Sequence, residues 1–134
     1  MRRAYPVAAY LVYALARLGT RCHAIDGTGL MHREQAGVLG AGELLLAVTY
    51  HPYANSVREI VTGAGERGAR VLLLTDAADA PSARHADCTL VVRDATTGDF
   101  RSLDASLCLA QALCLALGYR RGSGTDLPGD TPST

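Results

Sequence analysis

The sequence predicts an α/β protein with three layers, in which helices flank a mostly parallel sheet. Two continuously apolar runs, at residues 43–49 and 69–75, have the length of strands that are buried on both faces. Segments with helical apolar spacing alternate with such runs along the chain. This alternation is typical of β-α-β crossovers, which place parallel strands in one sheet and helices on its faces.

Length and charge limit the possible functions. The 134 residues suffice for one domain with one core. All thirteen cationic side chains are Arg, and they balance thirteen acidic ones without forming a long run of either sign. We therefore expect no binding of nucleic acid by this chain alone and no membrane binding. The absence of Lys excludes Schiff-base chemistry on lysine and a Walker A loop.

The cysteines predict a reducing compartment. All four have apolar neighbours, form no close C-x-x-C pair and follow no secretory segment. No apolar run approaches the roughly 20 residues of a membrane span. We expect a cytoplasmic protein with buried free thiols at Cys22, Cys88, Cys108 and Cys114.

The first third of the chain predicts a helix, a strand and a weaker helix. Apolar positions recur at helical spacing over residues 6–18, between Pro6 and Gly19. Residues 21–25 have the composition of a short strand that ends in a glycine-containing loop. A weaker helical pattern covers residues 31–39.

The middle of the chain predicts a β-α-β unit. The strand at residues 43–49 leads through a loop to Ser56 and Glu59, which have the spacing of a capping box. The helix that they begin is expected to end at Gly68, directly before the strand at residues 69–75.

The last third predicts a helical turn at residues 81–85, a strand at 88–92, a loop at 94–101 and an amphipathic helix from Leu103 to its stop at Gly118. The segment after it is rich in Gly, Pro, Ser, Thr and Asp and has little to bury. We therefore expect one domain over residues 1–118 and a disordered tail over 119–134.

The loop from Thr49 to Ser56 is the first candidate for a binding site. In open parallel sheets ligands bind beyond the carboxyl ends of the strands. This loop combines hydroxyls, an imidazole and an amide with the free N–H groups of a helix start, a combination that suits an anion. The alternative is that Ser56 only caps the helix and Tyr53 only packs.

Several segments resemble the SIS (sugar isomerase) domain. They are the stretch from Glu43 to Asp76 with its RGA-x-V-x-x-x-TD motif, the ADCTLVV strand, and Phe100-Arg101-Ser102 before the last helix. Together they span most of residues 5–118, and the nearest variety is the ligand-binding domain of RpiR-type regulators. The resemblance implies a flavodoxin-like, three-layer fold.

The resemblance also implies a site for a phosphosugar, whose phosphate is held by hydroxyls of the loop. Thr49 stands in the first hydroxyl position, His51 in the second and Ala54 where a later hydroxyl is usual, so that Ser56 would have to compensate. The expected ligand-binding residues are Thr49, His51, Tyr53, Asn55, Ser56 and Thr75.

The start of the chain departs from the family pattern, in which an apolar strand and a Gly/Ser loop precede the first helix. Here Arg3, Ala4 and Tyr5 stand where that loop would end, so the first, central strand is missing. Either the true start lies upstream, or the sheet closes differently, for example by exchange with a partner subunit.

Catalysis and metal binding have weaker support. An aldose–ketose isomerase needs a base and a proton shuttle; Glu34 is the best candidate for the base and His51 for the acid. The alternative is a solvated segment and an imidazole that only contacts ligand. The pairs Cys22-His23 and His85 with Cys88 lack four donors at a zinc-like spacing, so we expect no metal and no cofactor.

Three hypotheses remain open from the sequence. The first is a binding module for a small anionic metabolite, a sensor without a DNA-binding part. The second is a stand-alone sugar-phosphate isomerase. The third is an assembly role without a ligand. Because the first and last helices are apolar on most sides and must be covered, we expect a homodimer or larger homo-oligomer under all three.

Overall fold

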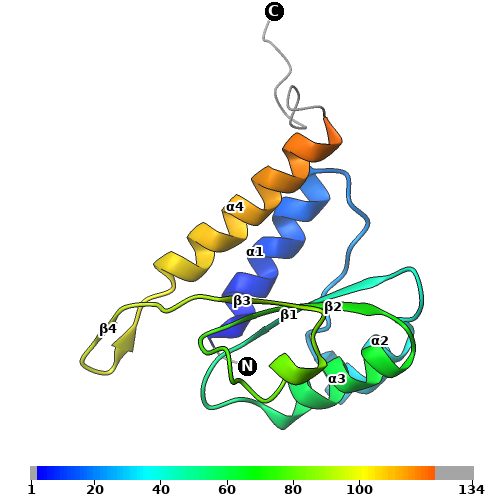
Figure 1. Ribbon diagram of the computed structural model, residues 1–134, viewed down its shortest axis with the longest axis horizontal. Helices are drawn as coiled ribbons and strands as arrows, with labels where there is room; N and C mark the ends of the chain where they lie inside the picture. Colours follow the sequence, from blue (N-terminus) through cyan, green and yellow to red (C-terminus); the bar gives the residue numbers. More distant parts are fainter. Residues whose placement is uncertain (1–2, 123–134) are drawn as a thin grey trace, which may run out of the picture.

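The computed structural model describes residues 3–122 and confirms an α/β fold with a parallel sheet (Figure 1). Strands β1 (Leu44–Thr49), β2 (Arg70–Thr75) and β3 (Cys88–Val91) are all parallel and lie in the order β1-β2-β3. Figure 1 shows α2 and α3 on one side of this sheet and α1 and α4 on the other. The three predicted layers are therefore present.

The helices account for most of the remaining described chain. Helix α3 connects β1 to β2 as the crossover of a β-α-β unit, and two 3-10 turns and a small antiparallel hairpin complete the structure. Their bounds are α1 (Ala4–Arg17), η1 (Thr28–Leu30), α2 (His32–Gly37), α3 (Asn55–Glu66), η2 (Ala83–His85), β4 (Thr96–Thr97), β5 (Phe100–Arg101) and α4 (Asp104–Arg121). None of the helices in this part of the chain is long and apolar enough to cross a membrane.

Each face of the sheet has its own apolar cluster. Leu45, Val71 and Leu73 point to the α3 side and pack against Val61 and Ala64. The side chains between them along the strands point to the opposite side and join a second cluster with α1 and α4. Val7, Leu11, Val48, Leu74 and Ala110 are its buried members. This alternation explains why the strands are apolar throughout.

The structure differs from the sequence prediction at two segments. Residues 21–25 are not a strand, because a strand needs a partner and β1 pairs only with β2 in the described sheet. The predicted loop at residues 94–101 contains the hairpin of β4 and β5. Its turn uses Gly98 with a positive φ of 60°, which glycine adopts without strain.

Two predicted helix ends are also wrong. Helix α3 begins at Asn55 with Ala54 as its N-cap and no side-chain cap, so Ser56 and Glu59 form no capping box. Helix α4 does not stop at Gly118 but continues to Arg121, because Gly118 is buried within the helix and does not end it. The rest of the predicted tail, residues 123–134, lies outside the described residues.

The cysteines are reduced, but only one of them is fully buried. Cys114 lies in the second apolar cluster, and burial raises the pKa of its thiol. Cys22 is half-buried and Cys88 and Cys108 are exposed, so the prediction of four buried thiols is wrong for these three. The error at Cys88 arises because β3 is an edge strand.

Candidate functional site

The carboxyl ends of β1 and β2 place two threonines side by side. Thr49 and Thr75 are partners in the parallel register, and both are buried. The chain leaves β1 through residues 50–54 and enters α3 at Asn55. The first N–H groups of α3, which have no acceptor within the helix, therefore lie at the same edge of the sheet as the two hydroxyls.

Asp76, the first residue after β2, fastens the loop that follows β1. Its carboxylate accepts a hydrogen bond of 3.0 Å from the His51 N–H and one of 2.7 Å from the Tyr53 hydroxyl. Burial by itself would raise the pKa of Asp76, but these two hydrogen bonds outweigh it and hold the pKa below its ordinary value. The loop is thus tied to the neighbouring strand by an ionised carboxylate.

The same contact raises the pKa of Tyr53 to about 12, through burial and through the hydrogen bond to Asp76. Because the folded state holds the neutral phenol, its contribution to stability is complete below the ordinary value of 10.0 and is lost as the pH rises through about 12. A spectrophotometric titration is expected to show one tyrosine with this midpoint that is missing in Tyr53→Phe. A Tyr53 midpoint near 10.0 would contradict the contact.

A buried polar network lies beside the loop. The Tyr50 hydroxyl donates to Ser106 Oγ at 2.7 Å, and that hydroxyl donates to Asp94 Oδ2 at 2.5 Å. The Asp94 side chain is completely buried, and its Oδ1 accepts the Ser106 N–H at 3.0 Å. Burial raises the pKa of Tyr50, so its hydroxyl stays protonated as a donor.

Arg3 joins this network to the start of α1. Its guanidinium lies 3.4 Å from Asp94 Oδ2 and stacks on the Tyr50 ring with 4.4 Å between the guanidinium carbon and the ring centroid. The buried Nε of Arg3 has no hydrogen-bond partner among the described residues. Arg101 in β5 donates to the His51 carbonyl at 2.9 Å. Two guanidinium groups therefore lie next to the loop.

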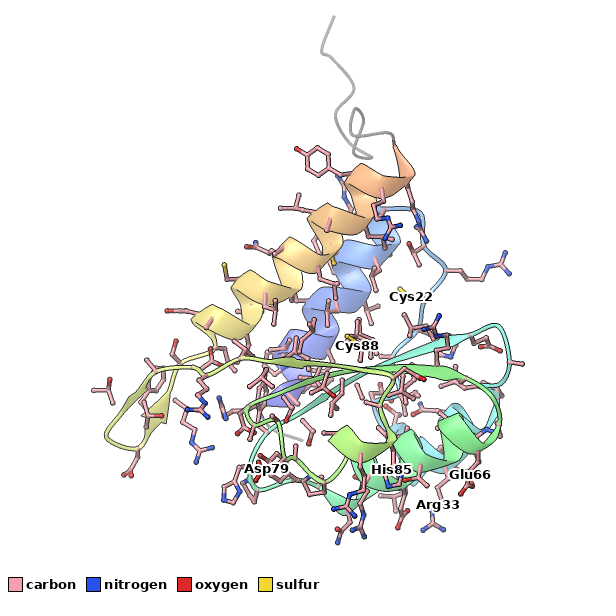
Figure 2. All side chains as sticks on the ribbon, in the orientation of Figure 1. Cys22, Arg33, Glu66, Asp79, His85 and Cys88 are labelled. Atoms are coloured by element: carbon pink, nitrogen blue, oxygen red, sulfur yellow. The ribbon has the colours of Figure 1, made fainter. Side chains whose placement is uncertain are left out.

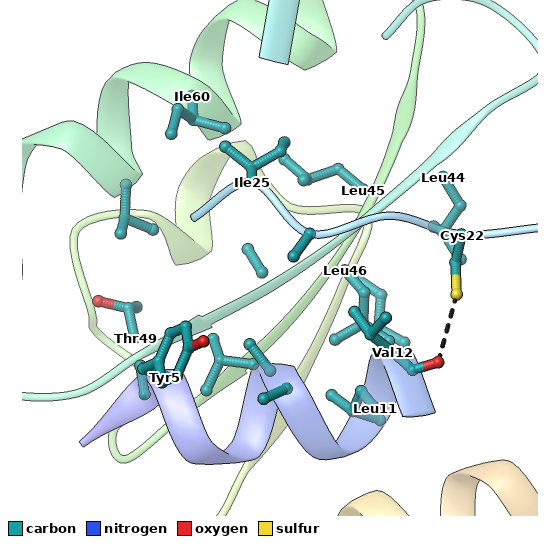
Figure 3. Close-up of a pocket in the computed structure, with 18 of the residues that line it drawn as sticks. Tyr5, Leu11, Val12, Cys22, Ile25, Leu44, Leu45, Leu46, Thr49 and Ile60 are labelled. Atoms are coloured by element: carbon teal, nitrogen blue, oxygen red, sulfur yellow. Dashed lines mark hydrogen bonds between the residues drawn. The ribbon is translucent and has the colours of Figure 1, made fainter. Parts of the chain in front are cut away.

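A cleft of about 1250 Å³ runs along β1 and reaches the loop (Figure 3). Of the residues predicted to bind ligand, Thr49, His51 and Ser56 line it, and Arg3 and Arg101 line it with them. The other three, Tyr53, Asn55 and Thr75, are not among its lining residues within the described chain. Tyr53 instead packs edge-on against the His51 ring, with ring centroids 5.7 Å apart.

Glu34 does not meet this cleft. It is exposed on α2, and its neighbour Arg33 forms an ion pair of 3.2 Å with Glu59 of α3. Figure 2 shows Arg33 on the α3 side of the sheet, among the outer side chains. Of the described residues that line the cleft, Glu34 is not one. The structure thus separates the two residues, Glu34 and His51, for which sequence suggested acid and base roles.

The residues considered for a metal are also apart. Figure 2 shows Cys88 and His85 on different sides of the sheet. Within residues 3–122 no group of three or more His, Cys, Asp or Glu side chains is placed to hold a metal ion.

Sequence reasoning missed the residues that build the walls of the site: Arg3, Tyr50, Asp94 and Ser106. Their contacts join the first, middle and last thirds of the chain, and no local spacing relates them. The one local signal is Asp76 in the TD pair after β2, because a carboxylate at the end of a buried strand needs donors nearby.

Comparison with known proteins gives the family. The SIS domain pattern matches residues 1–116. The sugar isomerase domain of an RpiR transcription factor from Sphaerobacter thermophilus is 26% identical with a TM-score of 0.76, over 88% of this chain and 66% of that chain. The Vibrio vulnificus NanR protein complexed with ManNAc-6P is 24% identical with a TM-score of 0.76, over 90% and 47%.

A third structure, an Escherichia coli CFT073 protein in complex with a sugar phosphate, shares 13% identity and a TM-score of 0.70, over 90% of this chain and 66% of that chain. Among curated protein sequences none matches. The chain thus spans between about half and two thirds of the length of these solved structures. Because one family pattern covers residues 1–116 and structures of that family share the parallel sheet, this chain belongs to the SIS domain family.

Proposed function

We propose that this chain is a binding module for a sugar phosphate, whose phosphate lies against the loop between β1 and α3. One observation carries the proposal: Thr49, His51 and Ser56 line the same cleft as the guanidinium groups of Arg3 and Arg101. Hydroxyls and guanidinium groups at the start of a helix form the kind of donor set that phosphate takes. NanR with ManNAc-6P and the Escherichia coli complex are related proteins with such ligands.

Two features modify the donor set of this loop. Ala54 supplies no hydroxyl, and the His51 N–H already donates to Asp76. We infer that Ser56, on the first turn of α3, takes part in place of residue 54, and that the Arg pair supplies the positive charge. The sugar then extends along the cleft towards the apolar side chains of α1 and β1.

An isomerase has less support. Its base must lie within hydrogen-bond reach of the carbon-bound proton. Only two of the described lining residues are carboxylates, Asp26 and Glu43. Glu43 directly precedes β1, at the opposite end of that strand from Thr49, and Asp26 accepts hydrogen bonds from the Thr28 N–H and the Gln35 amide.

The test is a thermal-shift experiment with the full chain and a panel of hexose and pentose phosphates, including ManNAc-6P, beside the same sugars without phosphate. A ligand at a hundredfold excess over its dissociation constant stabilises the native state by about 2.7 kcal/mol. We expect a shift with at least one phosphorylated sugar and none with its unphosphorylated form, and loss of most of that shift in Thr49→Val.

The matched control is Thr89→Val, a half-buried threonine of β3 outside the cleft lining, which is expected to keep the shift. No shift across the panel in a folded protein would overturn the proposal. Conversion of a bound sugar phosphate to its isomer would favour the enzyme instead. Location in the cytoplasm and a homodimer stay predictions from the sequence.

A further inference from the structure

Strand β1 has a free edge that faces the cleft. In a parallel ladder the backbone groups of alternate residues point to opposite neighbours. The Glu43 carbonyl accepts from the Arg70 N–H, so odd-numbered residues of β1 point to β2. The N–H and C=O groups of Leu44, Leu46 and Val48 therefore point away from β2, and all three residues line the cleft.

Residues 21–25 form a second unpaired backbone row on the other side of the cleft. All five line it, and no hydrogen bond joins their backbone groups to other described residues. Their side chains lie in the same layers as those of a strand. Cys22 donates to the Val12 carbonyl on the α1 side, whereas Ile25 packs into the cluster on the α3 side (Figure 3).

We propose that the cleft binds an extended, apolar segment of another polypeptide chain, which inserts as a strand between β1 and residues 21–25. Such a strand hydrogen-bonds on both edges at once, to Leu44, Leu46 and Val48 and to residues 21–25. Its side chains alternate between the α1 layer and the α3 layer. Both layers present apolar walls to the cleft, with Val12 and Leu15 on one side and Val57 and Ile60 on the other.

The dimensions favour a peptide over a small molecule. The cleft volume of about 1250 Å³ exceeds the roughly 300–1000 Å³ of common small-ligand pockets. All six residues of β1 line it, which corresponds to about 20 Å of strand. A free edge with unpaired backbone donors and acceptors is the feature that β-augmentation uses.

The length of the matched structures supports an occupant outside this chain. This chain covers 66% of the Sphaerobacter domain, so that fold is built from more polypeptide than the described residues supply. The chain's own residues 123–134 are an unsuitable strand, because they contain two Pro and four Gly or Asp residues and few apolar ones. A separate apolar strand is therefore the occupant to which we commit.

The first test is amide hydrogen exchange on the full chain, alone and with a synthetic peptide. The peptide has a core of alternating Val and Ala as long as β1, with Arg at both ends for solubility. In the chain alone, the amides of Leu44, Leu46 and Val48 are expected to exchange faster than those of Leu45 and Ala47. With the peptide they are expected to slow by at least tenfold.

The matched control peptide carries Pro at alternate core positions and so lacks every second N–H. It is expected to leave the exchange rates unchanged. Equal protection by both peptides, or no protection by either, would overturn the proposal. Protection of the three amides in the chain alone would also overturn it, because a segment of the chain or a second copy would then cover the edge.

The second test uses two variants of one edge residue. Leu46→Pro removes the N–H that faces the cleft and spares the hydrogen bonds to β2, whereas Leu46→Ala removes only the side chain. The proline variant is expected to weaken peptide binding at least tenfold, and the alanine variant to bind. Equal binding by both would count against strand insertion; if the proline variant does not fold, the comparison of the two peptides decides. Neither test depends on a sugar phosphate.

Discussion

Replacing Asp94 with alanine is expected to lower the free energy of unfolding by about 3 kcal/mol. The change removes the only carboxylate beside Arg3 in the buried network and two hydrogen bonds from Ser106 at the start of α4. It leaves a partly buried guanidinium and a helix start without acceptors. Urea denaturation of the full chain measures the loss, which is a large share of the roughly 5–15 kcal/mol that typical domains possess.

The control for this variant is Asp99→Ala in the exposed turn between β4 and β5, which is expected to change stability by less than about 0.5 kcal/mol. Ser106→Ala removes one hydroxyl of the network, and a loss of about 1 kcal/mol is expected. If Asp94→Ala were no more harmful than Asp99→Ala, the network would not hold α1 and α4 against the sheet.

Replacing Asp76 with alanine is expected to weaken sugar-phosphate binding at least tenfold, about 1.4 kcal/mol at 25 °C. The loop then loses both acceptors that fix the His51 backbone and the Tyr53 ring, so a ligand must order the loop when it binds. Isothermal titration with the sugar phosphate that gives the largest thermal shift measures the effect. Asp79→Ala, an exposed carboxylate of the same loop after β2, is the matched control.

The two possible results for Asp76 separate two roles of the carboxylate. Weaker binding with Asp76→Ala alone supports the role in positioning the loop. Tighter binding would contradict it, because the carboxylate would then act mainly by repelling the phosphate and not by ordering the loop.

Sequence predicted the fold where the signal is local. Strands β1 and β2 are apolar at nearly every position because both faces of the sheet are covered, and a run of that length has few other structural interpretations. Helices α1 and α3 were predictable for a similar reason, since their apolar side chains recur along one face. The segment at residues 21–25 had the same local signal, but a strand also requires a partner that the described sheet does not offer.

Sequence predicted only part of the candidate site. Thr49, His51 and Ser56 follow from the rule that ligands bind at the carboxyl ends of parallel strands. Arg3, Asp94 and Ser106 do not, because the Arg3–Asp94 pair joins positions 91 residues apart and no periodicity relates them. The role of Asp76 depends on where the loop folds back, which the sequence does not specify.

The two apolar clusters differ in how much chain must exist before each can close. The cluster under α3 uses buried residues from Leu39 to Leu73, a continuous stretch. The cluster under α1 and α4 joins Val7 to Cys114 and therefore requires almost the whole chain. During synthesis, the side of the sheet that faces α3 can be covered while the other side waits for α4 to leave the ribosome. A nascent chain thus exposes Val48 and Leu74 longest.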